Sequence, residues 1–240
     1  METNSKGWRD RPFNTETEKD FRTVVVGDSV SFGRRVNVSQ TWVKQFETKI
    51  NQSTDQDIEV LNLGSVGEDA KDKQETVENW ALGYNPDLII LQLSQHDEQN
   101  RTRIDELRED YLTNISDPSE SERNQAHDFA LEKEEEERTK MSEKESMTVI
   151  TESLDSIESE AEENVPLMVV GMEMREDQNR ILDNISKDRE WSYHSLSDEI
   201  RQLDYIIPEE GYYNEEGHKL IAEKVDSKLS EQIIDLASSS

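Results

Sequence analysis

A short glycine-flanked segment near the N-terminus carries the residue best suited to covalent chemistry. Residues 27–33 read GDSVSFG and directly follow the apolar run TVVV at 23–26. A serine in a turn between a strand and a helix exposes its hydroxyl, which attacks a carbonyl carbon when a base removes its proton. Ser29 is therefore the candidate nucleophile. The same letters also suit a turn and a helix N-cap, so this segment alone does not decide the function.

Three further segments place polar residues or glycines next to predicted elements. Residues 62–67 read NLGSVG at the end of one apolar run, and residues 94–97 read SQHD directly after the run LIILQL. Residues 210–222 read EGYYNEEGHKLIA and lead into a helical pattern. In a parallel α/β sheet the site lies at the carboxyl ends of the strands, so these segments are where a site is expected.

Together, the four segments resemble, in order, the sequence blocks of the SGNH/GDSL hydrolases. GDSVSFG is similar to the first block, with Ser29 at the nucleophile position, and NPDLIILQL at 85–93 is typical of the strand before the third block. In NLGSVG, Gly67 matches the glycine whose N–H helps to form the oxyanion hole. The resemblance covers roughly residues 22–235 and implies a flavodoxin-like three-layer α/β/α sandwich with a mostly parallel five-stranded sheet.

The third block departs from the family pattern. It normally reads Gly-x-Asn-Asp, whereas this chain has Ser94, Gln95, His96 and Asp97. The family's Asn donates an N–H to the developing oxyanion, and an imidazole at His96 can also donate one N–H. Alternatively, His96 serves as the base for Ser29. It cannot easily do both in one step.

The last block departs further. The position of the family's catalytic histidine falls on Tyr212, and its acidic partner falls on Glu210, or on Glu209 under the longer spacing. A phenol has a pKa near 10 and is a poor base at pH 7. The resemblance thus implies a catalytic set of Ser29, His96, Tyr212 and Glu210. The oxyanion donors would be Ser29, Gly67 and His96, and the group that activates Ser29 stays open.

The three other histidines have simpler interpretations. His218 lies on the terminal helical pattern and His194 near a possible strand, and both are expected to be packing or surface residues. His127 lies in an acidic stretch, where it is expected to face solvent unless a lid carries it inward. Tyr212 and Tyr213 are candidates for an aromatic floor beneath a bound sugar.

Apolar periodicity predicts the elements that position these residues. Strands are predicted at 23–26, 58–63, 88–93 and 167–170, with a fifth near 191–194 or 205–207. Strands that alternate with helical patterns predict a parallel sheet covered on both faces. The helical patterns are apolar stripes, formed by Trp42, Phe46 and Ile50; by Val77, Trp80 and Ala81; by Ile150, Leu154 and Ile157; and by Leu220, Ile221, Val225, Leu229 and Ile233.

One long polar stretch interrupts this pattern. Residues 98–145 are rich in acids, including EKEEEER at 132–138, and a connection between strands rarely needs so many residues. We expect a single domain over residues 1–240 that carries this stretch as an acidic, mainly helical insertion. The stretch is either solvated or partly disordered, or it is a lid over the site.

The charge of the chain limits its environment and its partners. Asp and Glu number 56 against 27 Lys and Arg, for a formal net charge of -29. The acids are spread along the segments with folded patterns, which predicts a halophilic protein of a high-salt cell, where the Debye length is about 3 Å at 1 M. A partly disordered acidic tail is the alternative. So negative a surface disfavours nucleic acid and anionic lipid.

The remaining observations leave three functions in competition. The chain has no cysteine, no apolar run of transmembrane length and no secretory leader pattern, so we expect a cytoplasmic protein without membrane insertion, cofactor or metal. The first function is a serine hydrolase of acyl or acetyl esters. The second is a catalytically inactive SGNH-fold protein that binds a glycan or acyl ligand. The third is a protein that docks a partner through its acidic insertion. The oligomeric state stays open.

Overall fold

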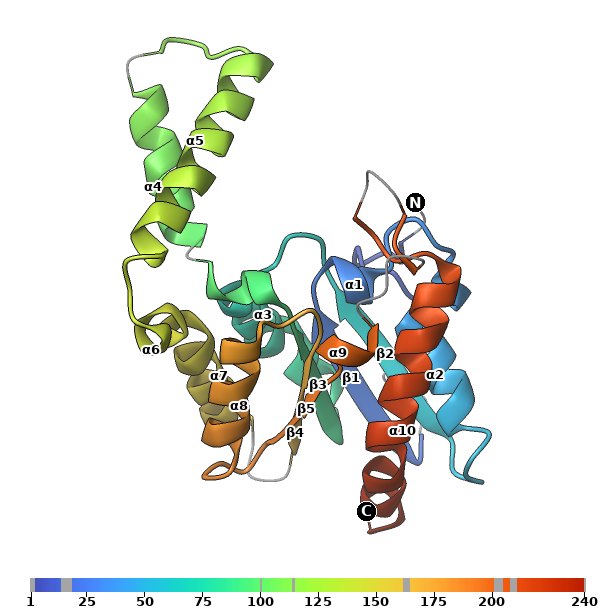
Figure 1. Cartoon of the computed structure of the whole chain (residues 1–240). Coiled ribbons are helices and arrows are strands. Elements are labelled where there is room, and N and C mark those ends of the chain that lie inside the picture. The colour runs from blue at the N-terminus through green and yellow to red at the C-terminus, as the bar shows by residue number, and fades with distance from the viewer. Residues whose placement is uncertain are drawn as a thin grey trace.

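The molecule is built on one five-stranded parallel sheet with helices on both faces (Figure 1). The computed structural model describes residues 3–13, 19–99, 101–113, 115–161, 165–200, 205–207 and 211–239. The strand order is β2-β1-β3-β4-β5. The strands are β1 (Phe21–Gly27), β2 (Ile58–Gly64), β3 (Leu88–Leu93), β4 (Leu167–Gly171) and β5 (Ser192–Ser195). This confirms the predicted three-layer α/β/α class.

The first four strands are buried along their whole length, which explains why they read as continuous apolar runs. Helices α2 (Trp42–Ile50) and α10 (Glu215–Ser239) pack on one face, together with the short α9 (Ser197–Ile200). Helices α3 (Ala70–Thr76), α7 (Thr148–Glu160) and α8 (Glu176–Ser186) cover the other face. Each face therefore has its own apolar core.

Shorter elements join these layers. The turn helices are α1 (Ser29–Phe32) and α6 (Glu143–Ser146), with 3-10 turns η1 (Val38–Gln40), η3 (Leu82–Tyr84) and η4 (Gln95–Glu98). A π-helical turn, η2 (Val77–Ala81), extends α3. The fifth strand lies at the first of its two predicted places, and Ile206 of the second forms only an isolated antiparallel bridge with Tyr213.

One predicted apolar stripe is partly wrong. Val77 and Ala81 are buried as expected, but Trp80 is 43% exposed and meets Trp8 edge-on at 6.1 Å. The stripe assumed 3.6 residues per turn, whereas η2 is a π-helical turn, in which the extra residue rotates the side chains out of register.

The acidic stretch forms a helical hairpin that projects from the sheet body, drawn in green to yellow in Figure 1. Its helices are α4 (Arg101–Leu112) and α5 (Glu120–Arg138). They share a small apolar core that includes Ile104, Leu107 and Ala130, and Arg103 Nη2 pairs with Glu137 Oε1 at 2.9 Å.

Glu98 anchors the base of this hairpin to the body. Its buried carboxylate accepts hydrogen bonds from Arg175 beside α8, at 2.5 and 2.9 Å, and from Arg138 at the end of α5. Charge-assisted pairs of this geometry are short and strong. They set the position of α5 relative to the end of β3. Within the described ranges, no helix is long and apolar enough to cross a membrane.

Candidate active site

Ser29 is the first residue of α1, directly after β1. The N-cap is Asp28, whose Oδ1 accepts a hydrogen bond from the Val30 N–H at 2.9 Å. Gln92 of β3 holds the same turn: its Oε1 accepts from the Asp28 N–H and from the Ser31 hydroxyl, each at 3.0 Å. Among the described residues, none forms a hydrogen bond with Ser29 Oγ, which is therefore available to a ligand.

A close approach between β2 and α1 fixes the same turn from the other side. Asn62 Nδ2 donates to the Ser31 carbonyl at 2.8 Å. At Gly64 a side-chain Cβ would lie 2.4 Å from the Phe32 amide nitrogen and 2.6 Å from the Ser31 carbonyl carbon. Only glycine fits there, because any side chain at this position of β2 would push the backbone of α1, and Ser29 with it, away from the sheet.

Ser29, Gly67 and His96 line one cavity of about 400 Å³. They come from the segments that follow β1, β2 and β3, as expected for the carboxyl edge of a parallel sheet. The hairpin supplies one wall of the cavity. That wall consists of Ile104, Asp105, Arg108, His127 and Leu131, and the other lining residues are Asp28, Glu68, Asp69, Ser94 and Gln99. A volume of this size suits a small ligand.

The Gly67 backbone has φ +81°, in the left-handed region that side chains rarely adopt. His96 is exposed on the turn η4, and its Nε2 lies 3.5 Å from the side-chain amide of Gln95. Gly67 and His96, two of the three candidate oxyanion donors, therefore come from different loops of one pocket.

A buried ion cluster adjoins this pocket through Asp28, which lines the cavity. Lys73 of α3 is fully buried, and its ammonium lies 2.6 and 2.7 Å from the carboxylate oxygens of Asp97 and 3.5 Å from Asp28 Oδ2. Burial opposes its charge, but Asp97 and Asp28 outweigh burial and keep the pKa of Lys73 above its ordinary value. Burial also raises the pKa of Asp97 to about 6, despite the attraction of Lys73. The cluster joins α3 to the turns that follow β1 and β3, and it includes Asp28, the residue before Ser29.

Glu68 adds a second perturbed carboxyl to the wall. Burial raises its pKa to about 7, against the attraction of Lys73, and Thr76 donates a hydrogen bond to its Oε1 at 3.2 Å. Neither Lys73 nor Glu68 is marked by any sequence pattern, and reasoning from the sequence missed both. Gln92 could have been noticed from the sequence, since it is the single polar residue in the apolar run LIILQL and a buried polar side chain needs a hydrogen-bond partner.

Tyr212, at the position of the family's catalytic histidine, does not line the pocket. Its hydroxyl accepts a hydrogen bond from Arg34 at 2.8 Å, and the guanidinium lies 4.9 Å from the ring centre. Tyr213 is buried and donates to Glu173 at 2.8 Å, so it forms no floor for a ligand. Glu209 and Glu210 lie outside the described residues.

The remaining histidines divide into two groups. His218 is buried, accepts a hydrogen bond from the Trp42 N–H at 3.3 Å, and burial lowers its pKa to about 4. His194 is half-buried on β5, and burial lowers its pKa as well. Both are packing residues away from the pocket. His127 differs, because the hairpin places it in the wall of the Ser29 pocket.

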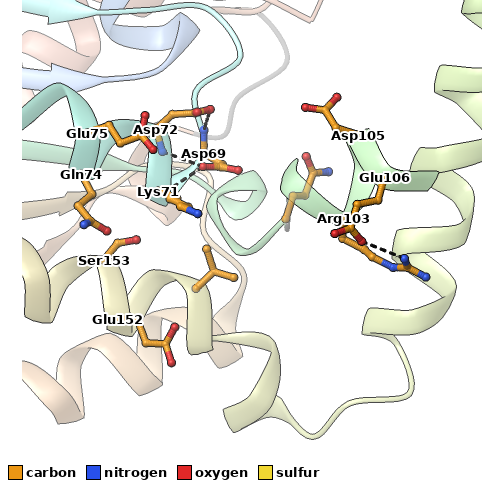
Figure 2. Close-up of a pocket in the computed structure, with 12 residues that line it drawn as sticks. Asp69, Lys71, Asp72, Gln74, Glu75, Arg103, Asp105, Glu106, Glu152 and Ser153 are labelled. Atoms are coloured by element: carbon orange, nitrogen blue, oxygen red, sulfur yellow. Dashed lines mark hydrogen bonds and ion pairs between the residues drawn. The ribbon is translucent and has the colours of Figure 1, made fainter. Parts of the chain in front are cut away.

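A second cavity, of about 650 Å³, adjoins the first and shares Asp69, Gln99 and Asp105 with it. Figure 2 shows α3, α4 and α7 around this space. Carboxylates dominate its lining, including Asp72, Glu75, Glu106 and Glu152, against two cations, Lys71 and Arg103. The approach to the Ser29 pocket from this side is therefore strongly acidic.

No protein-family model matches the chain, and no curated relative matches it. Solved structures do match its fold. The Clostridium thermocellum family 3 carbohydrate esterase has a TM-score of 0.61 at 15% identity, over 90% of this chain and 98% of that chain.

Two further solved structures are similar. The psychrotrophic esterase EstA from a Pseudoalteromonas species, inhibited by monoethylphosphonate, has a TM-score of 0.57 at 13% identity, over 89% of this chain and 98% of that chain. A putative lipolytic protein of the G-D-S-L family from Desulfitobacterium hafniense has a TM-score of 0.54 at 16% identity, over 86% and 98%. Together with the sheet order and the position of Ser29, these likenesses show that the chain has the fold of the SGNH/GDSL hydrolases.

Proposed function

We propose that the protein hydrolyses small, neutral carboxylic esters, with Ser29 as the nucleophile. The observation that carries this proposal is the pocket itself. The hydroxyl of Ser29 has no hydrogen-bond partner among the described residues, and it shares a cavity of about 400 Å³ with two groups able to stabilise an oxyanion. The esterase and lipolytic names of the structural neighbours support the same reaction class.

The proposed reaction follows the logic of acyl transfer through a serine. Ser29 Oγ attacks the ester carbonyl while a base takes its proton, and the carbonyl electron pair moves onto oxygen. The N–H groups of Ser29 and Gly67, together with the His96 imidazole, donate hydrogen bonds to that oxyanion. Donors held in place before the reaction stabilise the transition state more than the ground state, which lowers the barrier.

The lining of the pocket favours a particular substrate. Ile104 and Leu131 offer apolar surface to an acyl or acetyl group. The acidic cavity beside the pocket repels a substrate that carries its own carboxylate or phosphate. A neutral acetylated sugar or a short-chain ester meets both conditions.

Hydrolysis of p-nitrophenyl acetate in molar KCl tests the proposal. We expect turnover by the native chain and a loss of about 10³-fold or more in kcat/KM for Ser29→Ala, because the nucleophile is removed while the oxyanion donors remain. Salt is required in the assay because a net charge of -29 destabilises the folded state at low ionic strength.

Circular dichroism on both proteins shows whether each is folded under assay conditions. Ser31→Ala is a poor control because Gln92 binds that hydroxyl, whereas Ser39→Ala alters an exposed serine that does not line the pocket. Equal turnover by native protein and Ser29→Ala, both folded, would contradict the proposal.

One observation favours a second candidate, a non-catalytic protein that binds a neutral glycan or acyl ligand in the same pocket. Arg34 holds Tyr212, so this residue is not available to Ser29 as a base. Under this alternative the pocket binds a ligand without turnover. Binding of acetylated sugars by calorimetry, equal in the native chain and Ser29→Ala, would support it.

A further inference from the structure

We infer that His127, carried by the helical hairpin, is the base that activates Ser29. This inference rests on the proposed function, and it names the group that the last sequence block does not supply. His127 lies 98 positions after Ser29 in the chain, on an insertion rather than on the segment before α10 where the family resemblance places the base.

The position of His127 on α5 places it in the lining of the Ser29 pocket. His127, Leu131, Glu134 and Arg138 follow one another at spacings of four, three and four residues, which places them on one face of the helix. Leu131 lines the Ser29 pocket, and Glu134 is buried. Arg138 binds Glu98 at the base of the hairpin. The face that carries His127 therefore also carries a second residue of the pocket lining and, at its lower end, the arginine that binds the body.

The anchor of this face lies next to the site. Glu98 is two residues after His96 on the turn η4, so the ion pairs of Glu98 with Arg138 and Arg175 tie α5 to the loop that also carries the candidate oxyanion donor. On the facing helix α4, Ile104 and Arg108 line the same pocket. The hairpin is thus a wall of the site, with an imidazole in that wall.

Two different histidines can fill the two roles of oxyanion donor and general base. His96 cannot donate a hydrogen bond to the oxyanion and accept the Ser29 proton with ease in one step. With His127 as the base, His96 is free to act as the donor. The base must reach Ser29 Oγ directly or through one water, and such contacts often tighten only when substrate binds.

The proton balance is that of a two-step acyl transfer. His127 takes the Ser29 proton as Oγ bonds to the carbonyl carbon, and the imidazolium then protonates the leaving alkoxide as its C–O bond breaks. In the second step His127 takes a proton from water as the water oxygen bonds to the acyl carbon. The imidazolium returns that proton to Ser29 Oγ as the acid leaves. No other reactant is needed.

The test compares His127→Ala and His127→Gln with the native chain in the ester assay. We expect kcat to fall by about 10²–10⁴-fold in both, the range that a general base contributes, with KM little changed. Added imidazole should restore part of the turnover in His127→Ala and none in Ser29→Ala. Rescue of this kind separates a proton acceptor from a residue that only packs. Because His127 is exposed, neither substitution is expected to prevent folding.

His194→Ala is the matched control, since His194 does not line the pocket, and its turnover should equal that of the native chain. Ser29-dependent turnover that is unchanged in His127→Ala overturns this inference and leaves the proposed function intact. A loss that imidazole does not restore assigns His127 a structural role and also overturns it. Absence of Ser29-dependent turnover in the folded native chain contradicts the proposed function, and the role of His127 fails with it.

Discussion

Lys73→Met is expected to lower the free energy of unfolding by about 3–5 kcal/mol, the cost of removing one partner from a buried ion pair. The lysine ammonium is fully buried between Asp97 and Asp28, and its removal leaves two buried carboxylates without their cation. Urea unfolding in molar KCl measures the loss. Asp28 caps α1, so activity should fall together with stability.

The decrease in the free energy of unfolding caused by Lys73→Met should depend on pH. In the native protein Asp97 has a folded pKa of about 6, above its ordinary value, so its contribution to stability is present at low pH and is lost as the pH rises through about 6. Without Lys73, the ionised forms of Asp97 and Asp28 lower the free energy of unfolding further, because no buried cation balances their charge. Lys73→Met should therefore be more destabilising at pH 8 than at pH 5, where protonation relieves the unpaired charge.

Lys71→Met is the matched control, because it makes the same substitution and the same charge change on an exposed position of the same helix. Its effect should be within about 0.5 kcal/mol. A loss of similar size in both variants would show that net charge, rather than the buried cluster, causes the effect.

Gly64→Ala is the second large expected effect. The new methyl group would lie 2.4 Å from the Phe32 amide nitrogen and 2.6 Å from the Ser31 carbonyl carbon, so the backbone of α1 must move. We expect a loss of about 2–3 kcal/mol, at the upper end for overpacking. We also expect reduced turnover, since α1 begins with Ser29.

Gly83→Ala serves as the comparison, because a Cβ at Gly83 meets no atom within 4 Å and no left-handed φ is required there. Its stability should change little. Urea unfolding measures the free energy of unfolding of both variants. If Gly64→Ala is as stable as Gly83→Ala, then β2 does not constrain the Ser29 turn as described.

Much of the fold was predictable because buried parallel strands leave a strong signal. Strands β1 to β4 are buried along their whole length, so most of their residues are hydrophobic. The fifth strand was ambiguous because β5 reads SYHS and is only half-buried. A half-buried strand needs fewer apolar residues and therefore leaves a weaker apolar pattern in the sequence.

The candidate site was predictable only where it lies at strand ends. Ser29, Gly67 and His96 follow three strands, and the sheet brings them to one cavity. Lys73 had no signal, since its immediate neighbours in AKDKQET are polar and its burial arises only when α3 packs against α7, β1 and the turn η4. His127 was equally hidden, because its placement depends on how the hairpin packs and on the pairing of Arg138 with Glu98.

The most direct test of the central claim, that Ser29 is an activated nucleophile, is covalent labelling with a p-nitrophenyl alkylphosphonate in molar KCl. A hydroxyl whose proton a base removes attacks the phosphorus and displaces p-nitrophenolate, whereas an unactivated hydroxyl reacts far more slowly. We expect the intact mass to rise by one phosphonyl group, the group to be located on Ser29, and Ser29→Ala to take no label. A folded native chain that takes no label, or that takes it on another residue, would contradict the account.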